Sequence, residues 1–511
     1  MKTEVNVKTV KVKKSGADIL VQLLIEEGYQ LFRDQYGEAC IASPSEPLMA
    51  KRILSKETSL MIRRMVWEKY EKVLQEKPLE SSILTLEGLA LFSDVVKETY
   101  TRVAKVGNTI YYDVGDNKHV VVVTSDGWSV ETTAPVYFRR YTHQLPQVIP
   151  VPGGDIKHFK KYIHISNKVH EILLISYLPV CFVADIDRPL LLMHGPQGAG
   201  KSTALEFVRS LIDPSRLPLL QPPKDEKEMV QQANKHYAYF LDNISFIKND
   251  ISDTLCRFVT GSAFSKRVLY TDDDDFLYEF KRVTGFTSIA QVANNSDLLD
   301  RSLIIQLELI KQNSRISDEQ LNREFAEEKP YLMGSLFDAV SGMLKNIAEV
   351  HFEELPRMAD YYRYAAAASK QLGYEIQGYV DAFAVNIKHQ NQESIESSPI
   401  IQSILIFMKE RQTYRGTSTA LYIQLKDIAE RFDMISGFPK GATWLWRKIT
   451  QCKATLISIG IDADRSHETD SRYISLTKTD TYNPAMDESI PDSCEANQQV
   501  FTDALTPPVN I

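Results

Sequence analysis

The sequence Gly195-Pro196-Gln197-Gly198-Ala199-Gly200-Lys201-Ser202 decides the fold of this chain. It fits the pattern G-x-x-x-x-G-K-[ST] at every fixed position. The apolar run 189–193 before it predicts a buried strand, and the stretch 203–208 after it opens a helix. Glycines let such a loop turn its backbone N–H groups onto phosphate oxygens, where a side chain would block the approach. The stretch therefore predicts a nucleotide-binding loop between a strand and a helix.

The residues of this loop have separate expected roles. Lys201 is placed to neutralise the β- and γ-phosphates, and the Ser202 hydroxyl is placed to ligate Mg²⁺. The N-terminus of the following helix favours an anion. The alternative interpretation is a glycine turn that binds nothing. We expect ATP and Mg²⁺ as cofactors, with the nucleotide bound by Gly195, Pro196, Gln197, Gly198, Ala199, Gly200, Lys201, Ser202 and Thr203.

A second strand signal ends in an acid. Residues 236–243 form an apolar strand pattern up to Asp242, which we expect to bind Mg²⁺ through water, together with Ser202. Asn243 follows, where the commonest ATPase pattern has a glutamate that orients the attacking water. An asparagine can position water but cannot take a proton, so either hydrolysis is slow or another acid assists. The acidic run 272–275 offers candidates, although a solvated hairpin turn is the more ordinary interpretation of that run.

The bulk composition is that of an ordinary globular protein. Hydrophobic residues make up 43% and charged residues 25% of 511 residues, and the formal net charge is −8. Five scattered cysteines lack metal-ligand spacing and are expected to be reduced thiols. Residues 1–14 lack the apolar core of a secretory signal, and the most apolar run, 172–184, is too short to span a bilayer and predicts a core helix. We expect a cytoplasmic, nucleoid-associated protein with no membrane partner.

Composition and periodicity divide the chain into five predicted segments. Helical periodicity at 16–33 and 56–77 precedes a β-meander that begins at Thr109. A polar stretch at 390–398 is expected to be a linker, and the last segment, with no Lys or Arg, is expected to be disordered. The segments are an N-terminal α+β domain (1–145), an α/β ATPase core (146–312), a helical lid and linker (313–392), a winged-helix domain (393–478) and an acidic tail (479–511).

A series of short motifs follows the second strand. The motifs are Cys256-Arg257-Phe258-Val259-Thr260-Gly261, Phe264-Ser265-Lys266-Arg267-Val268-Leu269-Tyr270-Thr271-Asp272, Phe280-Lys281-Arg282 and Asp297-Leu298-Leu299-Asp300-Arg301-Ser302. The series resembles the ATPase core of primase-helicase-type proteins carried by phages, plasmids and integrative elements, which belong with the superfamily 3 and MCM-like helicases of the AAA+ class. The resemblance covers roughly residues 91–478, including the Asp242-Asn243 pair. It implies an α/β fold with an AAA+ P-loop ATPase core, a helical lid, an N-terminal α+β domain and a C-terminal winged helix.

The same resemblance implies catalytic roles beyond Lys201, Asp242 and Asn243. Arg301 matches an arginine finger, which reaches the γ-phosphate held by a neighbouring subunit; the alternative is an arginine that closes a helix. Thr287 falls where a polar sensor residue sits, although many relatives have asparagine there. Arg357 matches a lid sensor arginine or is a surface arginine. A finger that acts in trans requires an oligomer, because a monomer leaves the γ-phosphate charge unanswered. The resemblance suggests a hexameric ring.

Two regions are candidates for DNA contact. Residues 399–478 have the helix order of a winged helix and carry 12 Lys and Arg against 8 Asp and Glu, so positive charge is concentrated there. Its third predicted helix, 442–459, would enter the major groove, although such domains also dock proteins. A hairpin around 268–280 forms the second region. The candidate contacts are Arg447, Lys448 and Lys453 on the helix, and Lys266, Arg267, Lys281 and Arg282 on the hairpin arms.

These patterns together predict an ATP-dependent DNA helicase, a ring motor that replicates a mobile element, plasmid or virus-like replicon. Its expected partners are single-stranded, forked or origin DNA, further copies of itself, and a separate primase, because residues 1–145 contain no D-x-D for nucleotidyl transfer. Unwinding polarity of the 3′–5′ type follows from the resemblance alone. One alternative is an origin-binding initiator or loader whose ATPase is an assembly switch. The other is a regulatory ATPase with a protein-docking winged helix.

Overall fold

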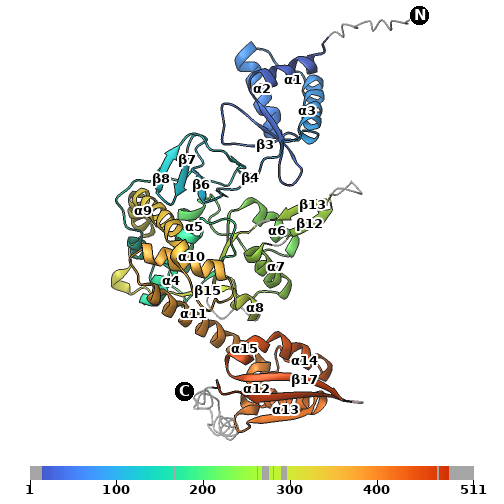
Figure 1. Ribbon diagram of the computed structural model, residues 1–511, viewed down its shortest axis with the longest axis vertical. Helices are drawn as coiled ribbons and strands as arrows, with labels where there is room; N and C mark the ends of the chain where they lie inside the picture. The colour runs from blue at the N-terminus through green and yellow to red at the C-terminus, as the bar shows by residue number, and fades with distance from the viewer. Residues whose placement is uncertain are drawn as a thin grey trace, which may run out of the picture.

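The computed structural model describes residues 14–165, 167–261, 263–267, 275–279, 281–288, 296–468 and 471–482, with backbone only in the two short stretches 263–267 and 275–279. Three units follow one another along the long axis of the molecule (Figure 1). The N-terminal helices lie at one end, the helices and strands around β10 to β15 form the middle, and the helices after α11 form the other end. The expected mixed α/β fold is confirmed.

A four-stranded parallel sheet forms the centre of the middle unit. Its strands are β10 (Leu190–His194), β11 (Ala238–Leu241), β14 (Val283–Ser288) and β15 (Ser302–Gln306), in the order β11-β14-β10-β15. Strands β10, β11 and β14 are buried along almost their whole length because helices cover both faces, as parallel sheets require. All four strands run the same way, so the segments that follow them meet at one edge.

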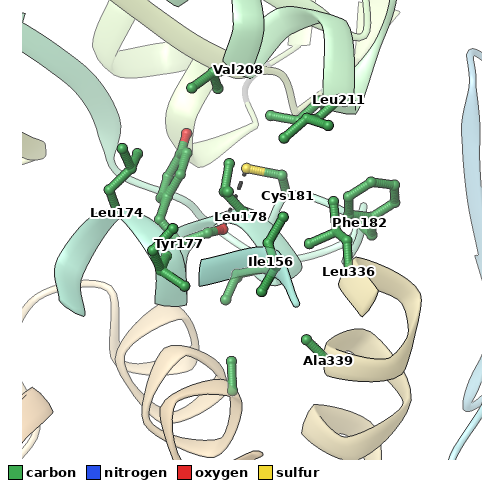
Figure 2. Packing of buried hydrophobic residues seen from close by; sticks show 14 of the residues in the cluster. Ile156, Leu174, Tyr177, Leu178, Cys181, Phe182, Val208, Leu211, Leu336 and Ala339 are labelled. Atoms are coloured by element: carbon green, nitrogen blue, oxygen red, sulfur yellow. Dashed lines mark hydrogen bonds between the residues drawn. The ribbon is translucent and has the colours of Figure 1, made fainter. Parts of the chain in front are cut away.

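Helices cover the sheet on both sides. One apolar cluster joins α4 (Lys168–Val180), α5 (Lys201–Ile212) and α9 (Asp318–Asn346), and Figure 2 shows Leu178, Leu211 and Leu336 from these helices converging. The Cys181 thiol donates to the carbonyl of Tyr177 at 3.4 Å in the same region. The predicted core helix at 172–184 is confirmed as α4. The remaining helices are α6 (Glu226–Lys235), α7 (Asn249–Thr260), α8 (Ser296–Leu299), α10 (Ala359–Gln371) and α11 (Ile376–Glu396).

The N-terminal unit has its own small core. It consists of α1 (Gly16–Glu26), β1 (Gln30–Arg33), β2 (Ala39–Ala42), β3 (Lys51–Arg52), α2 (Lys56–Tyr70) and α3 (Glu76–Leu91). The helical pattern expected over 16–33 is therefore wrong in its second half. The turn at Gly28, with φ of +83°, ends the helix, and Leu31 and Phe32 pair with β2 as a strand. Leu24 and Leu86 anchor the separate cluster.

The predicted β-meander is confirmed and belongs to the middle unit by its packing. It comprises β5 (Val103–Val106), β6 (Thr109–Asp113), β7 (Val120–Thr124) and β8 (Gly127–Glu131). Ile110, Tyr112 and Val121 are fully buried in the same cluster as α4, α5 and α9. The apolar cluster therefore crosses the boundary predicted at residue 145. Two further strands, β4 (Thr99–Tyr100) and β9 (Tyr137–Phe138), pair with each other, and the 3-10 helix η1 (Ile156–Tyr162) leads into α4.

A buried ion network fastens the meander to the sheet. The guanidinium of Arg102 donates to Asp213 Oδ1 at 3.0 Å, and the guanidinium of Arg209 donates to Asp213 Oδ2 at 3.1 Å. Burial acts to raise the pKa of Asp213, but the two guanidinium groups outweigh it and hold that pKa well below its usual value. All three side chains are inaccessible to solvent, so each depends on the others for its charge balance.

The C-terminal unit contains helices and a three-stranded antiparallel sheet. The helices are α12 (Pro399–Met408), α13 (Ser418–Arg431), α14 (Ala442–Gln451) and α15 (Lys453–Ser458), and the strands are β16 (Thr413–Thr417), β17 (Ile461–Glu468) and β18 (Ser471–Lys478). The expected hairpin over 461–476 is confirmed as β17 and β18. The third helix is broken at Cys452 rather than continuous, and the sequence analysis missed β16, which pairs with β18.

The expected linker at 390–398 is wrong. The helix α11 continues to Glu396, and α12 begins at Pro399 after a two-residue turn. Gln390 explains why a polar stretch stays helical, because its side chain is buried and donates to the carbonyl of Ser302 at the start of β15. Ser394 is also buried and shares a hydrogen bond with Thr455 of α15. These polar side chains face protein rather than water.

Candidate nucleotide-binding site

The glycine loop, residues 195–202, joins the end of β10 to the start of α5. Gly200 is the residue before α5 and has φ of +71°, and Gly198 has φ of +83°, a region that favours glycine. A β-carbon on Gly195 would lie 2.5 Å from the carbonyl oxygen of Leu307, so a larger residue does not fit there. The loop conformation therefore requires glycine at the fixed positions of the motif. Pro196, Gln197, Ala199 and Thr203 lie in the same loop and first helical turn.

Lys201 extends back over the loop. Its ammonium group donates to the carbonyls of Gly195 and Pro196, each at 2.9 Å. Partial burial lowers the pKa of Lys201, while the nearby carboxylate of Asp242 opposes that shift. The positive charge of Lys201 thus lies at the mouth of the loop and interacts with the carboxylate of Asp242.

Asp242 and Ser202 come together as predicted. The Ser202 hydroxyl donates to Asp242 Oδ1 at 2.8 Å, and the Thr287 hydroxyl donates to the same oxygen at 2.6 Å. The strand register explains the contact with Thr287. Phe286 of β14 pairs with Leu241, the last residue of β11, so the next residues of the two strands, Thr287 and Asp242, also lie close together. On its other side β14 pairs with β10, where Thr287 lies opposite Met193. Asp242 therefore has its carboxylate fixed by two hydroxyl groups at the carboxyl edge of the sheet.

Thr287, the predicted sensor residue, lies at the site and makes two hydrogen bonds there. Its side chain is buried, and its oxygen also accepts the backbone N–H of Asn243 at 2.8 Å. The hydroxyl therefore holds both Asp242 and the residue after it. Asn243 has φ of +49°, a conformation that asparagine adopts more readily than most residues. Its side chain is exposed at the same edge.

Sequence reasoning missed Glu206, a carboxylate near this site. It lies on α5 one helical turn after Ser202, and its pKa is raised by burial and by the carboxylates of Asp242 and Asp318. The spacing of four residues from Ser202 on a helix was the signal that could have found it. The acids at 272–274 lie outside the described residues, and of Asp275 only the backbone is described.

Arg301 lies at the opposite edge of the sheet from the glycine loop. Its carbonyl accepts the N–H of Leu190, the first residue of β10, whereas the glycine loop follows the last residue of that strand. At about 3.3 Å per residue the two ends are separated by roughly 20 Å. Arg301 pairs with Asp297 at 3.2 Å, and Arg357 pairs with the same carboxylate at 2.7 Å. The structure therefore brings both arginines together, away from the loop of their own chain.

The hairpin that was expected to contact DNA is present, and the DNA contacts of its basic residues stay a prediction. The antiparallel pair β12 (Ala263–Arg267) and β13 (Asp275–Glu279) is confirmed and projects from the middle unit (Figure 1). The side chains of Lys266 and Arg267 lie outside the described part of the chain. Lys281 and Arg282 lie at the base of the hairpin, where both contact other parts of the chain, and their contact with DNA stays a prediction. Lys281 pairs with Asp187 at 2.8 Å, and the half-buried Arg282 donates to the backbone carbonyls of Ala233 and Asn234 in α6.

The candidate DNA contacts of the C-terminal unit have mixed surroundings. Arg447 and Lys448 are exposed on α14, and the Arg447 guanidinium lies 5.5 Å from the ring centre of the exposed Trp444. Both basic residues also line a cavity of about 910 Å³ that is shared with Phe246 of the middle unit. Lys453 lies on α15 instead of α14, 3.8 Å from the carboxylate of Asp462.

Two family models match the chain. Residues 156–384, which include the glycine loop, Asp242 and Arg301, match the model of the actinomycete integrative conjugative element replication protein. Residues 400–491 match the C-terminal domain of the same kind of replication protein. The chain is thus similar to a replication protein. This similarity agrees with the expected assignment to replication of a mobile element, at that coarser level. Curated proteins gave no match.

Solved structures show weaker likenesses. The apo structure of the NrS-1 C-terminal region is 11% identical to this chain, with a TM-score of 0.39. The match spans 91% of this chain and 100% of the NrS-1 chain. The X-ray structure of JCV helicase is 13% identical, with a TM-score of 0.24, and the match spans 43% of this chain and 65% of the JCV helicase chain. Similarities this low support no conclusion about this chain. Among the described helices, none is both long enough and apolar enough to cross a bilayer.

Proposed function

We propose that this protein hydrolyses ATP with Mg²⁺ and uses the energy to move on or unwind DNA during replication of an integrative element. One observation carries the proposal: the hydroxyls of Ser202 and Thr287 meet Asp242 at the mouth of a glycine loop that also holds Lys201. A lysine, a hydroxyl and a carboxylate in this arrangement suit a triphosphate with its metal. The similarity to a replication protein directs the proposal to DNA.

The oxygen atoms at this edge fit Mg²⁺. Magnesium prefers one or two carboxylates together with phosphate oxygens and water, and it retains several of its waters. Asp242 supplies the carboxylate, and Ser202 supplies a hydroxyl 2.8 Å from it. Thr287 keeps the carboxylate in one orientation, which leaves Asp242 to hold a metal-bound water. When bound, the metal would neutralise charge on the phosphate oxygens.

Water activation remains the incomplete part of the site. Asn243 can orient a water molecule through its amide but cannot accept a proton. Glu206 is the carboxylate nearest in sequence to the metal-binding pair, and its raised pKa makes it a stronger base than an ordinary glutamate. We propose that Glu206 assists the proton transfer and that turnover is slow when DNA is absent.

A ring assembly accounts for the position of Arg301. The arginine is roughly 20 Å from the glycine loop of its own chain along the strand direction. Its guanidinium can complete a nucleotide site only if a second copy brings its own loop to this edge. We propose a closed ring, and a hexamer is the form that the family resemblance suggests.

The first test compares the intact protein with Lys201→Ala. Wild-type protein should bind Mg·ATP and hydrolyse it faster with single-stranded or forked DNA, and the variant should lose turnover by about 100-fold or more because the phosphates lose their main cation. The control is Lys227→Ala, which removes one positive charge from the exposed face of α6. Near-normal turnover in Lys201→Ala would contradict the site assignment.

A second candidate function is a regulatory ATPase whose C-terminal unit docks a protein. The favouring observation is an apolar cavity of about 530 Å³ beside α14, lined by Phe438, Pro439 and the exposed Trp444. DNA binding separates the two candidates. Absence of binding to single-stranded and forked DNA at low salt would favour the docking function.

A further inference from the structure

The glycine loop is crossed by a segment to which the sequence analysis gave no role. Residues 307–317, here called the strap, follow β15 and lead into α9. The N–H of Leu307 donates to the carbonyl of His194 at 2.9 Å, and Glu308 donates to the carbonyl of His164 at 2.9 Å. The strap is thereby fixed on one side to the end of β10 and on the other to the chain before α4.

Side chains of the strap lie directly against the loop. A β-carbon placed on Gly200 would be 3.3 Å from Cδ1 of Ile310, and one placed on Gly198 would be 3.5 Å from Cδ1 of Leu309. The same position on Gly198 is 3.5 Å from Nη2 of Arg315. The guanidinium of Arg315, from the same chain, therefore lies beside Gly198, in van der Waals range of the point where a side chain at that position would begin.

Arg315 differs in its charge balance from Arg301 and Arg357, the two arginines to which the sequence assigned roles. Arg301 and Arg357 both pair with Asp297. Across the described ranges, the Arg315 side chain takes part in no salt bridge or hydrogen bond. It is also exposed. An uncompensated guanidinium beside a loop of inward-turned N–H groups has one complementary ligand, an anion with several oxygens in a plane or fork.

The end of the strap places it over the first turns of α5. Ser317 caps α9 by accepting the N–H of Gln320, and Asp318 is close enough to Glu206 to raise its pKa. The strap thus runs from the start of the glycine loop to the helix that follows it. Because α9 is packed into the core from Phe325 onward, the strap is held at both ends and keeps Arg315 near the loop.

We infer that Arg315 is a phosphate-binding residue of its own chain's nucleotide site, acting in cis where Arg301 acts in trans. The inference rests on the proposed function, because it takes the ligand to be the phosphate chain of Mg·ATP. Its guanidinium contributes two parallel donors to phosphate oxygens from the Gly198 side of the loop.

The test measures Mg·ATP affinity and turnover for Arg315→Ala, Arg315→Lys and the control Arg323→Ala. Arg323 is an exposed arginine on α9, eight residues further along the chain, so its loss removes the same charge away from the loop. We expect Arg315→Ala to weaken Mg·ATP binding about tenfold and to reduce turnover further. Arg315→Lys should recover part of the affinity, and Arg323→Ala should match wild type.

Mixing variants separates the cis role from a trans role. A ring made from Arg315→Ala and Lys201→Ala subunits should turn over no faster than its Arg315→Ala subunits do alone, because both lost groups belong to one chain's own site and no site in the mixture regains both. Restored turnover in that mixture would overturn the cis assignment, and Arg315→Ala with wild-type affinity and turnover would overturn the inference altogether. If wild-type protein itself has no affinity for Mg·ATP, the proposed function fails, and the inference fails with it for that separate reason. Unfolding curves of Arg315→Ala and Arg315→Lys exclude a folding defect.

Discussion

At the scale of single residues, Thr287 connects the two strands that form the candidate site. Its one hydroxyl donates to Asp242 and accepts from the N–H of Asn243. Groups that orient a metal-binding carboxylate typically change affinity or activity by about 10–100-fold when removed. Thr287 therefore acts by positioning Asp242, whatever further contact it makes with a nucleotide.

Replacement of Thr287 by valine should reduce turnover by about 10–100-fold and raise the Mg²⁺ concentration needed for half-maximal activity. Thr287→Ser keeps the hydroxyl and should keep most of the activity. Thr284→Val is a matched control on the same strand, because the buried Thr284 hydroxyl has no hydrogen-bond partner among the described residues. Equal turnover of Thr287→Val and Thr284→Val would show that the contact with Asp242 does not matter.

At the scale of secondary-structure elements, the network of Arg102, Arg209 and Asp213 joins the meander to α5. Removal of the carboxylate leaves two buried guanidinium groups without their counter-charge, a change that typically costs about 3–5 kcal/mol. The network therefore fixes the α5 helix, and with it the glycine loop at its N-terminus, relative to the meander.

Asp213→Asn should lower the melting temperature at pH 7, as measured by thermal unfolding. The pKa of Asp213 is depressed in the folded protein. Its stabilisation is therefore present above the pKa of an unfolded aspartate, about 3.9, and is lost as the pH falls toward the folded value. The difference between wild type and variant should shrink as the pH is lowered below about 4. Asp126→Asn, in the exposed turn before β8, should melt like wild type at both pH values.

At the scale of the whole molecule, the two edges of the parallel sheet have different functions in the proposal. The carboxyl edge carries the glycine loop, Asp242 and Thr287, and the opposite edge carries Arg301 and Arg357. A single copy cannot unite the two edges. Arg301 immediately precedes β15 and so lies at the edge opposite the glycine loop. If Arg301 acts on a phosphate, that phosphate must be bound by another copy, and the proposed ring follows.

Mixing Arg301→Ala with Lys201→Ala tests this arrangement. Each variant alone should be nearly inactive, and Arg301→Ala should still bind nucleotide. In a randomly mixed ring about a quarter of the sites combine an intact loop with an intact arginine from the next copy, so turnover should return. A fully active monomer, or a mixture that stays inactive while forming rings, would rule out the trans role.

The C-terminal unit makes a prediction at the same scale. Arg447→Ala with Lys448→Ala should weaken DNA binding and reduce the dependence of log affinity on log salt, because fewer counterions are released per contact. Lys453→Ala should have a smaller effect, since Lys453 already lies near Asp462. An unchanged salt slope in the double variant would place the DNA contact elsewhere and favour the protein-docking function.

The sequence by itself determined the local parts of this site. A glycine pattern between a strand and a helix specified the loop, and an apolar strand that ends in Asp242 specified its partner, because both depend on neighbouring residues and on the period of apolar side chains. The same reasoning failed at 390–398, where polar side chains are satisfied by β15 and α15 rather than by water.

Only the tertiary structure decided which distant residues meet. The pairing of β14 with both β10 and β11 brings Thr287 to Asp242, and the direction of β15 takes Arg301 to the far edge. The return of the chain after β15 places Arg315 beside the glycine loop, and the packing around α6 brings Arg282 to the carbonyl of Ala233. Strand order and chain reversal depend on packing between segments far apart in sequence, and a pattern of neighbouring residues does not specify them.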